Sequence, residues 1–187
     1  MIRTLALLCL VAGIAAAQPR APEIFGHVGR FRLAGDEGSL GSGASLGGAV
    51  TVPIPVWPKW AIDVDVVSAR TEHEGRDNEF WNRRRTLLVP ALVRRWSFTD
   101  RAIFFAGGGL GVRFDSTQQR YCVFAAPANQ CQLVNASDSA RDGSLGLRMG
   151  VVINPVSRLL VRGGVFTSWT HVLPDAGIRI GIGLRIQ

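Results

Sequence analysis

Hydrophobic and polar residues alternate with a period of two along most of this chain. The clearest run covers residues 177–186, where one set of alternate positions holds only isoleucine and leucine and the other only glycine and arginine. Successive side chains of a β-strand point to opposite faces, so this run predicts a strand with one apolar face. The same alternation recurs over residues 44–52, 60–69, 102–114, 143–153 and 159–169.

Two further runs, residues 24–33 and 80–96, predict strands with a mixed pattern. The second contains Pro90, which usually marks a bulge or an edge and leaves the facing of that strand open. Together these runs make about eight strands of roughly ten residues each, the length of tilted strands that cross a membrane.

The connections between the predicted strands alternate in length. Residues 53–58, 97–101 and 154–157 are tight turns, whereas residues 35–43, 70–79, 116–141 and 170–176 are mostly longer and more polar. Short turns on one side and long loops on the other are typical of outer-membrane barrels. The pattern therefore predicts an all-β fold, a single antiparallel up-and-down transmembrane β-barrel of about eight strands, with the long loops outside the cell.

A soluble β-sandwich or a lipocalin-like barrel would also alternate, with its apolar face turned inward. Here the apolar face is nearly unbroken, and the opposite face is rich in glycine, serine and arginine. Small residues suit the crowded interior of a narrow barrel, and a closed barrel satisfies every backbone polar group in lipid. These features favour hydrocarbon around the barrel.

The start of the chain has the pattern of an export signal. Arg3 precedes an uncharged run over residues 5–17 that ends in three alanines. A basic start, about a dozen apolar residues and a small-residue end are typical of a cleaved signal peptide. We therefore predict a signal peptide at residues 1–17 and a barrel domain at residues 18–187, exported to the bacterial outer membrane.

The formal net charge is +7, and almost all of the positive charge is arginine that is spread through the predicted strands rather than gathered in a basic helix or tail. This distribution argues against a nucleic-acid footprint and predicts charges inside the barrel. The predicted interior network comprises Asp63, Asp65, Arg113, Arg148, Arg162, Arg179 and Arg185. Because a buried arginine needs a partner, carboxylate–guanidinium pairs are expected, with water or loop carboxylates to complete them. An anion-favouring lumen is the alternative to a structural role.

Cys122 and Cys131 are predicted to form a disulfide, because an exported chain meets an oxidising compartment. They lie within residues 116–141, the predicted long loop and the best candidate for contact with a surface ligand. Neither a metal-ligand pattern nor a convincing catalytic constellation accompanies them, so the sequence predicts no metal, no cofactor and no enzyme activity.

With its glycine-rich alternating strands at residues 104–114 and 177–186, the chain resembles the small outer-membrane β-barrel family that includes the OmpA transmembrane domain and the OmpX- and OmpW-like proteins. The resemblance implies contact with outer-membrane lipid and insertion by the barrel-assembly machinery. It also favours a structural or surface-interaction role. A narrow channel or transporter for small or hydrophobic solutes is the alternative.

Overall fold

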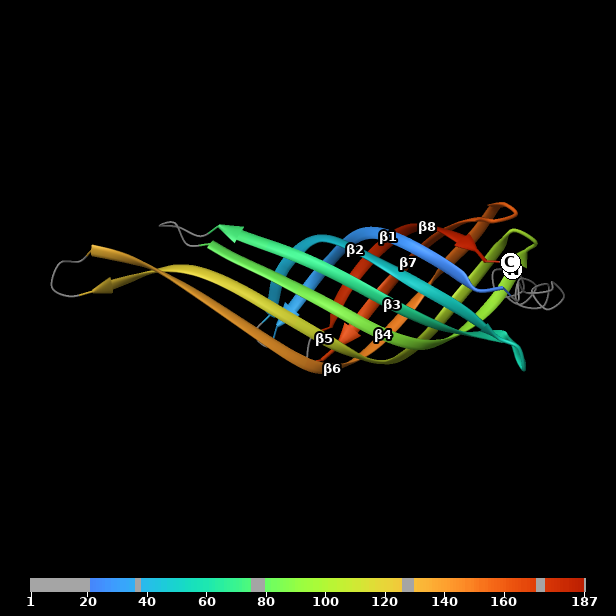
Figure 1. The fold of residues 1–187 in the computed structure, drawn as a ribbon, viewed down its shortest axis with the longest axis horizontal. Helices are drawn as coiled ribbons and strands as arrows, with labels where there is room; N and C mark the ends of the chain where they lie inside the picture. The colour runs from blue at the N-terminus through green and yellow to red at the C-terminus, as the bar shows by residue number, and fades with distance from the viewer. Residues whose placement is uncertain (1–20, 36–37, 75–79, 126–129, 171–173, 187) are drawn as a thin grey trace, which may run out of the picture.

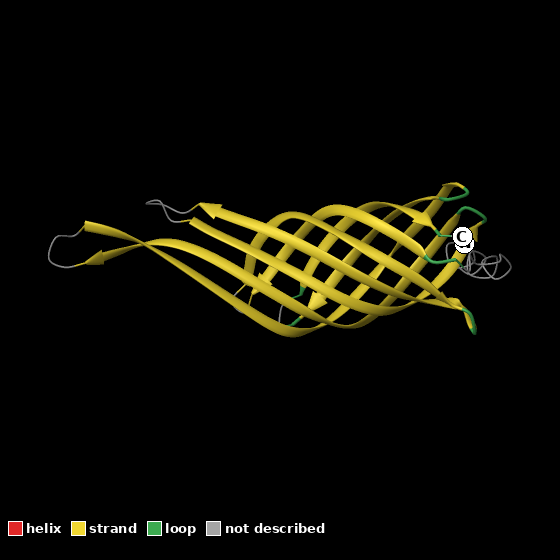
Figure 2. Cartoon of the chain, in the orientation of Figure 1, coloured by secondary structure: helices red, strands yellow, loops and turns green. Residues whose placement is uncertain are grey.

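The computed structural model describes residues 21–35, 38–74, 80–125, 130–170 and 174–186, and these form an antiparallel barrel of eight strands (Figure 1). The strands are β1 (Glu23–Gly35), β2 (Gly38–Ile54), β3 (Trp57–Glu74), β4 (Phe80–Thr99), β5 (Ala102–Ala125), β6 (Gln130–Val156), β7 (Leu159–Trp169) and β8 (Asp175–Arg185). Each strand pairs with its sequence neighbour, and β1 pairs with β8 to close the ring. Strands are the regular structure that Figure 2 shows, and the described residues include no helix with the length and hydropathy of a membrane span. The predicted fold class is confirmed.

The apolar face of each clearly alternating strand lies on the outside of the barrel, as predicted. On β8 the outward side chains of Ile178 and Leu184 are 69% and 59% exposed, whereas inward Arg179 is 7% exposed. The outward surface of the barrel is therefore apolar, and a chain with this surface requires hydrocarbon around it.

Strand β4 runs continuously through Pro90, whose facing the sequence left open. Pro90 points outward, and the inward positions on either side of it, Val89 and Ala91, are buried. Leu88 and Leu92 also point outward, so this strand is apolar on both faces and its alternation is weak. The absent N–H of Pro90 falls where the β4–β5 pairing is interrupted, between Leu88 and Leu92.

The prediction of a long loop at residues 116–141 is wrong. β5 and β6 stay paired from Ala102↔Ile153 to Ala125↔Gln130 and form a hairpin that projects well beyond the other strands (Figure 1). The consecutive residues from Asn135 to Arg141 are all exposed, so apolar and polar positions do not alternate there and this part of the hairpin lacks the pattern of a half-buried strand. The predicted loops at 70–79 and 35–43 are likewise strand in part, since β3 reaches Glu74 and β2 begins at Gly38.

The barrel interior holds large apolar side chains as well as the predicted small and charged ones. Phe31 and Phe166 pack with their ring centroids 5.9 Å apart within one buried cluster. A Cβ added at Gly177 would lie 2.3 Å from the Phe31 ring, and one at Gly183 would lie 2.4 Å from the ring of Phe25. The glycines of β8 therefore make room for aromatic rings of β1 in a narrow barrel.

Candidate functional site

Ion pairs cross the barrel interior at three levels. We call the end of the barrel that carries the turns at residues 55–56, 100–101 and 157–158 the short-turn end, and the opposite end the hairpin end. Seven arginines and six carboxylates of the described residues take part, and they are Arg85, Arg95, Arg113, Arg148, Arg162, Arg179, Arg185, Glu23, Asp63, Asp65, Asp115, Asp142 and Asp175.

Asp63 on β3 is the centre of the middle level. Both nitrogens of the Arg162 guanidinium fork donate to its carboxylate, Nη1 to Oδ1 at 3.0 Å and Nη2 to Oδ2 at 2.7 Å. Arg148 Nη1 donates to Oδ2 at 2.7 Å, and the Thr51 hydroxyl donates to Oδ1 at 2.5 Å. Asp63 is fully buried, so its negative charge is compensated entirely by these donors.

Asp65, two residues further along β3, forms the second half of this middle level. His27 Nε2 lies 3.0 Å from Asp65 Oδ1, and Arg179 forms an ion pair with Oδ2. Arg148 Nη1 bridges the two aspartates, because it also lies 3.3 Å from Asp65 Oδ2. Strands β1, β3, β6, β7 and β8 therefore meet in one buried network.

The short-turn end has its own ion pairs, built around Glu23. Arg95 Nη2 lies 3.1 Å from each Glu23 carboxylate oxygen, and Arg185 Nη2 lies 3.2 Å from Oε1. Glu23 and Arg185 are cross-strand partners in the β1–β8 ladder that closes the barrel. These contacts therefore tie the first strand to the last one.

The hairpin end is closed by Arg85 of β4. Its Nη1 donates to Asp175 at 2.6 Å, and its Nε and Nη2 donate to the two oxygens of Asp115 at 2.6 Å and 2.8 Å. Arg113 joins the same group through Asp142 at 2.7 Å and Asp115 at 3.3 Å. β4 and β8 lie on opposite sides of the ring, so the Arg85–Asp175 pair spans the mouth of the lumen.

The structure places all seven residues of the predicted network on the interior face, but it divides them among the levels. Asp63 and Asp65 meet Arg148, Arg162 and Arg179, whereas Arg185 and Arg113 pair with carboxylates that the sequence reasoning missed. The missed members are Glu23, His27, Arg85, Arg95, Asp115, Asp142 and Asp175. Arg85 and Arg95 are separated from Val89 by an even number of residues, so all three lie on the same face of β4. The sequence could therefore have placed both arginines in the interior, had the facing of β4 been known.

The side chains of Cys122 and Cys131 lie outside the described residues, so their disulfide stays a prediction. The backbone register sets Cys122 opposite Leu133 and Cys131 opposite Phe124. Among the described residues, no group of three histidine, cysteine, aspartate or glutamate side chains could hold a metal ion.

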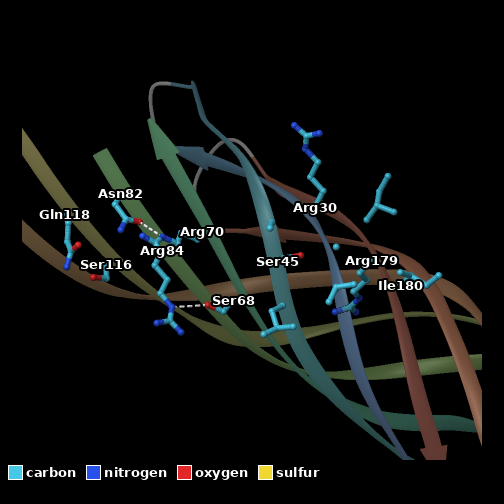
Figure 3. Close-up of a pocket in the computed structure, with 15 residues that line it drawn as sticks. Arg30, Ser45, Ser68, Arg70, Asn82, Arg84, Ser116, Gln118, Arg179 and Ile180 are labelled. Atoms are coloured by element: carbon cyan, nitrogen blue, oxygen red, sulfur yellow. Dashed lines mark hydrogen bonds between the residues drawn. The ribbon is translucent and has the colours of Figure 1, made fainter. Parts of the chain in front are cut away.

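A second region with charged side chains lies on the outside of the barrel (Figure 3). It is a groove of about 1110 Å³ whose lining includes the outward side chains of Arg30, Arg70 and Arg84. Arg70 Nε donates to Asn82 Oδ1 at 3.0 Å, and Arg84 Nε donates to Ser68 Oγ at 3.1 Å. These cations face away from the interior network.

The fold and the apolar exterior together define a class of protein, the small eight-stranded β-barrels of bacterial outer membranes. No family model and no curated protein sequence matches the chain, whereas solved structures of this class do. Ail of Yersinia pestis aligns with a TM-score of 0.60 and 10% identity over 90% of this chain and 100% of Ail.

Neisserial surface protein A aligns with a TM-score of 0.55 and 10% identity over 88% of this chain and 97% of that one. The N-terminal β-barrel domain of Pseudomonas aeruginosa OprF aligns with a TM-score of 0.50 and 8% identity over 90% and 100%. These neighbours confirm the predicted resemblance at the level of the fold, and they support an outer-membrane location.

Proposed function

We propose that this chain is an outer-membrane barrel with a closed lumen, which acts as a structural or surface-interaction protein rather than as a channel. The observation that carries the proposal is the set of ion pairs that cross the interior. Arg162 of β7 and Asp63 of β3 come from opposite strands of the ring, as do Arg85 of β4 and Asp175 of β8. These side chains are buried, and they occupy the cross-section that a diffusing solute would need.

The surface role belongs in this proposal to the projecting part of the β5–β6 hairpin, which replaces the loop expected at residues 116–141. Its described side chains from Asn135 to Arg141 are exposed and mostly uncharged, and the paired strands hold them in a fixed arrangement. Rigidly held exposed groups suit recognition of a ligand. The structural neighbour Ail has been solved in complex with the heparin analogue sucrose octasulfate, which supports a surface ligand for this chain.

Conductance tests the closed lumen. The mature chain, residues 18–187 in our proposal, is refolded into vesicles, and its heat-modifiable mobility on gels first verifies a folded barrel. Fusion of these vesicles with a planar bilayer is then expected to give no steady single-channel currents. Reproducible unitary currents from the folded protein would show a continuous aqueous path and would overturn the closed-lumen proposal in favour of a narrow channel.

Labelling of intact cells tests the location and the orientation. Both native cysteines of the mature chain are first replaced, by Cys122→Ser and Cys131→Ser. In this background, Ser137→Cys places a thiol on the exposed part of the hairpin. Val56→Cys places one at the short-turn end, where the Val56 side chain is 80% exposed. A membrane-impermeant maleimide is expected to label the first variant on intact cells and the second only after the outer membrane is permeabilised. Equal labelling of both on intact cells contradicts the proposed topology.

A further inference from the structure

Two arginines on the outer face of the barrel stand directly opposite each other. Arg70 of β3 and Arg84 of β4 are cross-strand partners, and both are exposed. Like charges in directly opposite positions destabilise a sheet. Arg70 has one carboxylate neighbour, Glu72 at 2.7 Å, whereas neither Arg84 nor Arg30 forms an ion pair with any described residue. The groove therefore carries excess positive charge, which a bound anion would offset.

The side chains around these arginines hold them in place. Asn82 accepts a hydrogen bond from Arg70 Nε, and Ser68 accepts one from Arg84 Nε. Figure 3 shows both contacts on one side of the groove. Nη2 of Arg70 is paired with Glu72, whereas the Nη groups of Arg84, which form the donating end of its guanidinium fork, make no ion pair with any described residue. This arrangement presents planar donors to an oxyanion, and a phosphate accepts such a fork through two oxygens.

The groove continues toward the short-turn end into the apolar surface of the barrel. Its lining includes Val28, Leu46, Ile178 and Ile180, whose exposed fractions are 54%, 66%, 69% and 59%. In the strand ladders, Arg30 is the register partner of Ile178, and Val28 is that of Ile180. Along β1 the outer surface therefore changes from cationic at Arg30 to apolar at Val28, which is the next outward position.

We propose that this groove binds a phosphorylated lipid of the outer leaflet, with its phosphate on Arg70 and Arg84 and its acyl chains along the apolar lining. The inference rests on the outer-membrane location proposed above. Basic residues beside a membrane surface attract anionic lipid headgroups, and the apolar lining adds contact area that only a lipid can use. A soluble sulfated polysaccharide would also offer anionic groups, but it would leave the exposed side chains of Val28 and Leu46 uncovered.

Binding to a diphosphorylated lipid A probe tests the inference, using protein refolded in uncharged detergent micelles. An Arg70→Gln and Arg84→Gln double variant removes the facing pair. A Lys59→Gln and Arg101→Gln double variant removes two exposed cations from the short-turn end and serves as the matched control. Each arginine beside an anionic lipid contributes roughly fivefold to binding, so the first variant is expected to weaken binding by about 30-fold and the control by less than about twofold.

Wild-type protein is also titrated with the same glycolipid after its phosphates are removed, with inorganic phosphate and with heparin. Loss of binding to the dephosphorylated lipid by about 30-fold supports the inference, even if the Arg70 and Arg84 variant does not fold. Equal binding of both lipids, equal binding of the two double variants, or preference for heparin over the lipid overturns it. Heat-modifiable mobility of each protein separates these outcomes from failure of the barrel itself.

Discussion

Replacement of Asp63 by asparagine isolates the contribution of the central ion pairs. The amide has nearly the shape of the carboxylate but no charge, and its NH₂ group cannot accept the hydrogen bonds that Arg148 or Arg162 donates. Arg162 loses both charged contacts of its fork, at 3.0 Å and 2.7 Å, in a fully buried setting. Removal of one partner from a buried ion pair costs about 3–5 kcal/mol, because the other charge stays buried without compensation.

Urea unfolding of the barrel in lipid vesicles, followed by tryptophan fluorescence and by gel mobility, measures this loss. At a slope of about 2 kcal/mol per molar urea, a loss of about 4 kcal/mol lowers the unfolding midpoint by about 2 M. Asp138→Asn is the matched control, since Asp138 is exposed on the projecting hairpin. We expect the control to change the free energy of unfolding by less than about 0.5 kcal/mol.

A second substitution identifies the cause. If the loss in Asp63→Asn comes from the uncompensated guanidinium, then Arg162→Met in the same chain restores stability, because the methionine is uncharged and packs on the Phe105 ring that Arg162 now covers at 4.3 Å. The double variant is expected to unfold at a higher urea concentration than Asp63→Asn alone. A loss below about 1 kcal/mol for Asp63→Asn, or additive losses in the double variant, would refute the reasoning.

Two other predictions concern the wall of the barrel. Gly109→Ala is expected to destabilise the barrel strongly, because the added Cβ would lie 1.9 Å from the Pro90 carbonyl oxygen. At Gly163 an added Cβ would have no atom within 4 Å, so Gly163→Ala is expected to unfold at the same urea concentration as the wild type. Comparable midpoints for the two alanine variants would contradict this. Met149→Arg on the apolar exterior is expected to cost about 2–4 kcal/mol in vesicles, and Ser137→Arg, on the exposed part of the hairpin, about 0–1 kcal/mol. Equal costs would show that lipid does not cover Met149.

The sequence predicts the wall of this barrel well, because strand facing is a local property. Over residues 177–185 of β8 and 144–151 of β6, every outward position is apolar and every inward one is glycine, serine or arginine, so these short runs suffice to assign both faces. The facing of β4 could not be assigned in this way. Its inward positions include Leu87 and Val93, which pack in the interior, and so both of its faces are apolar.

The partners of the interior charges could not be predicted in the same way. Arg148 reaches Asp63 across 85 positions of sequence, and Arg162 reaches it across 99. Asp115 and Asp142 lie near the ends of what reads as a polar loop, and only the extended β5–β6 hairpin carries them over the mouth of the barrel. Facing follows from neighbouring residues, whereas pairing across the lumen depends on the closure of the ring.

The buried charges solve a problem that alternation leaves open. A slip of one residue between two strands turns apolar side chains inward and is strongly disfavoured, but a slip of two residues keeps every face correct. In the β1–β8 ladder, a two-residue slip moves Arg185 about 7 Å along the strand from its partner Glu23, and it displaces Arg179 from Asp65 by a similar distance. Because an unpaired buried charge costs several kcal/mol, these ion pairs select one register of the closing strands among those that the apolar pattern permits equally.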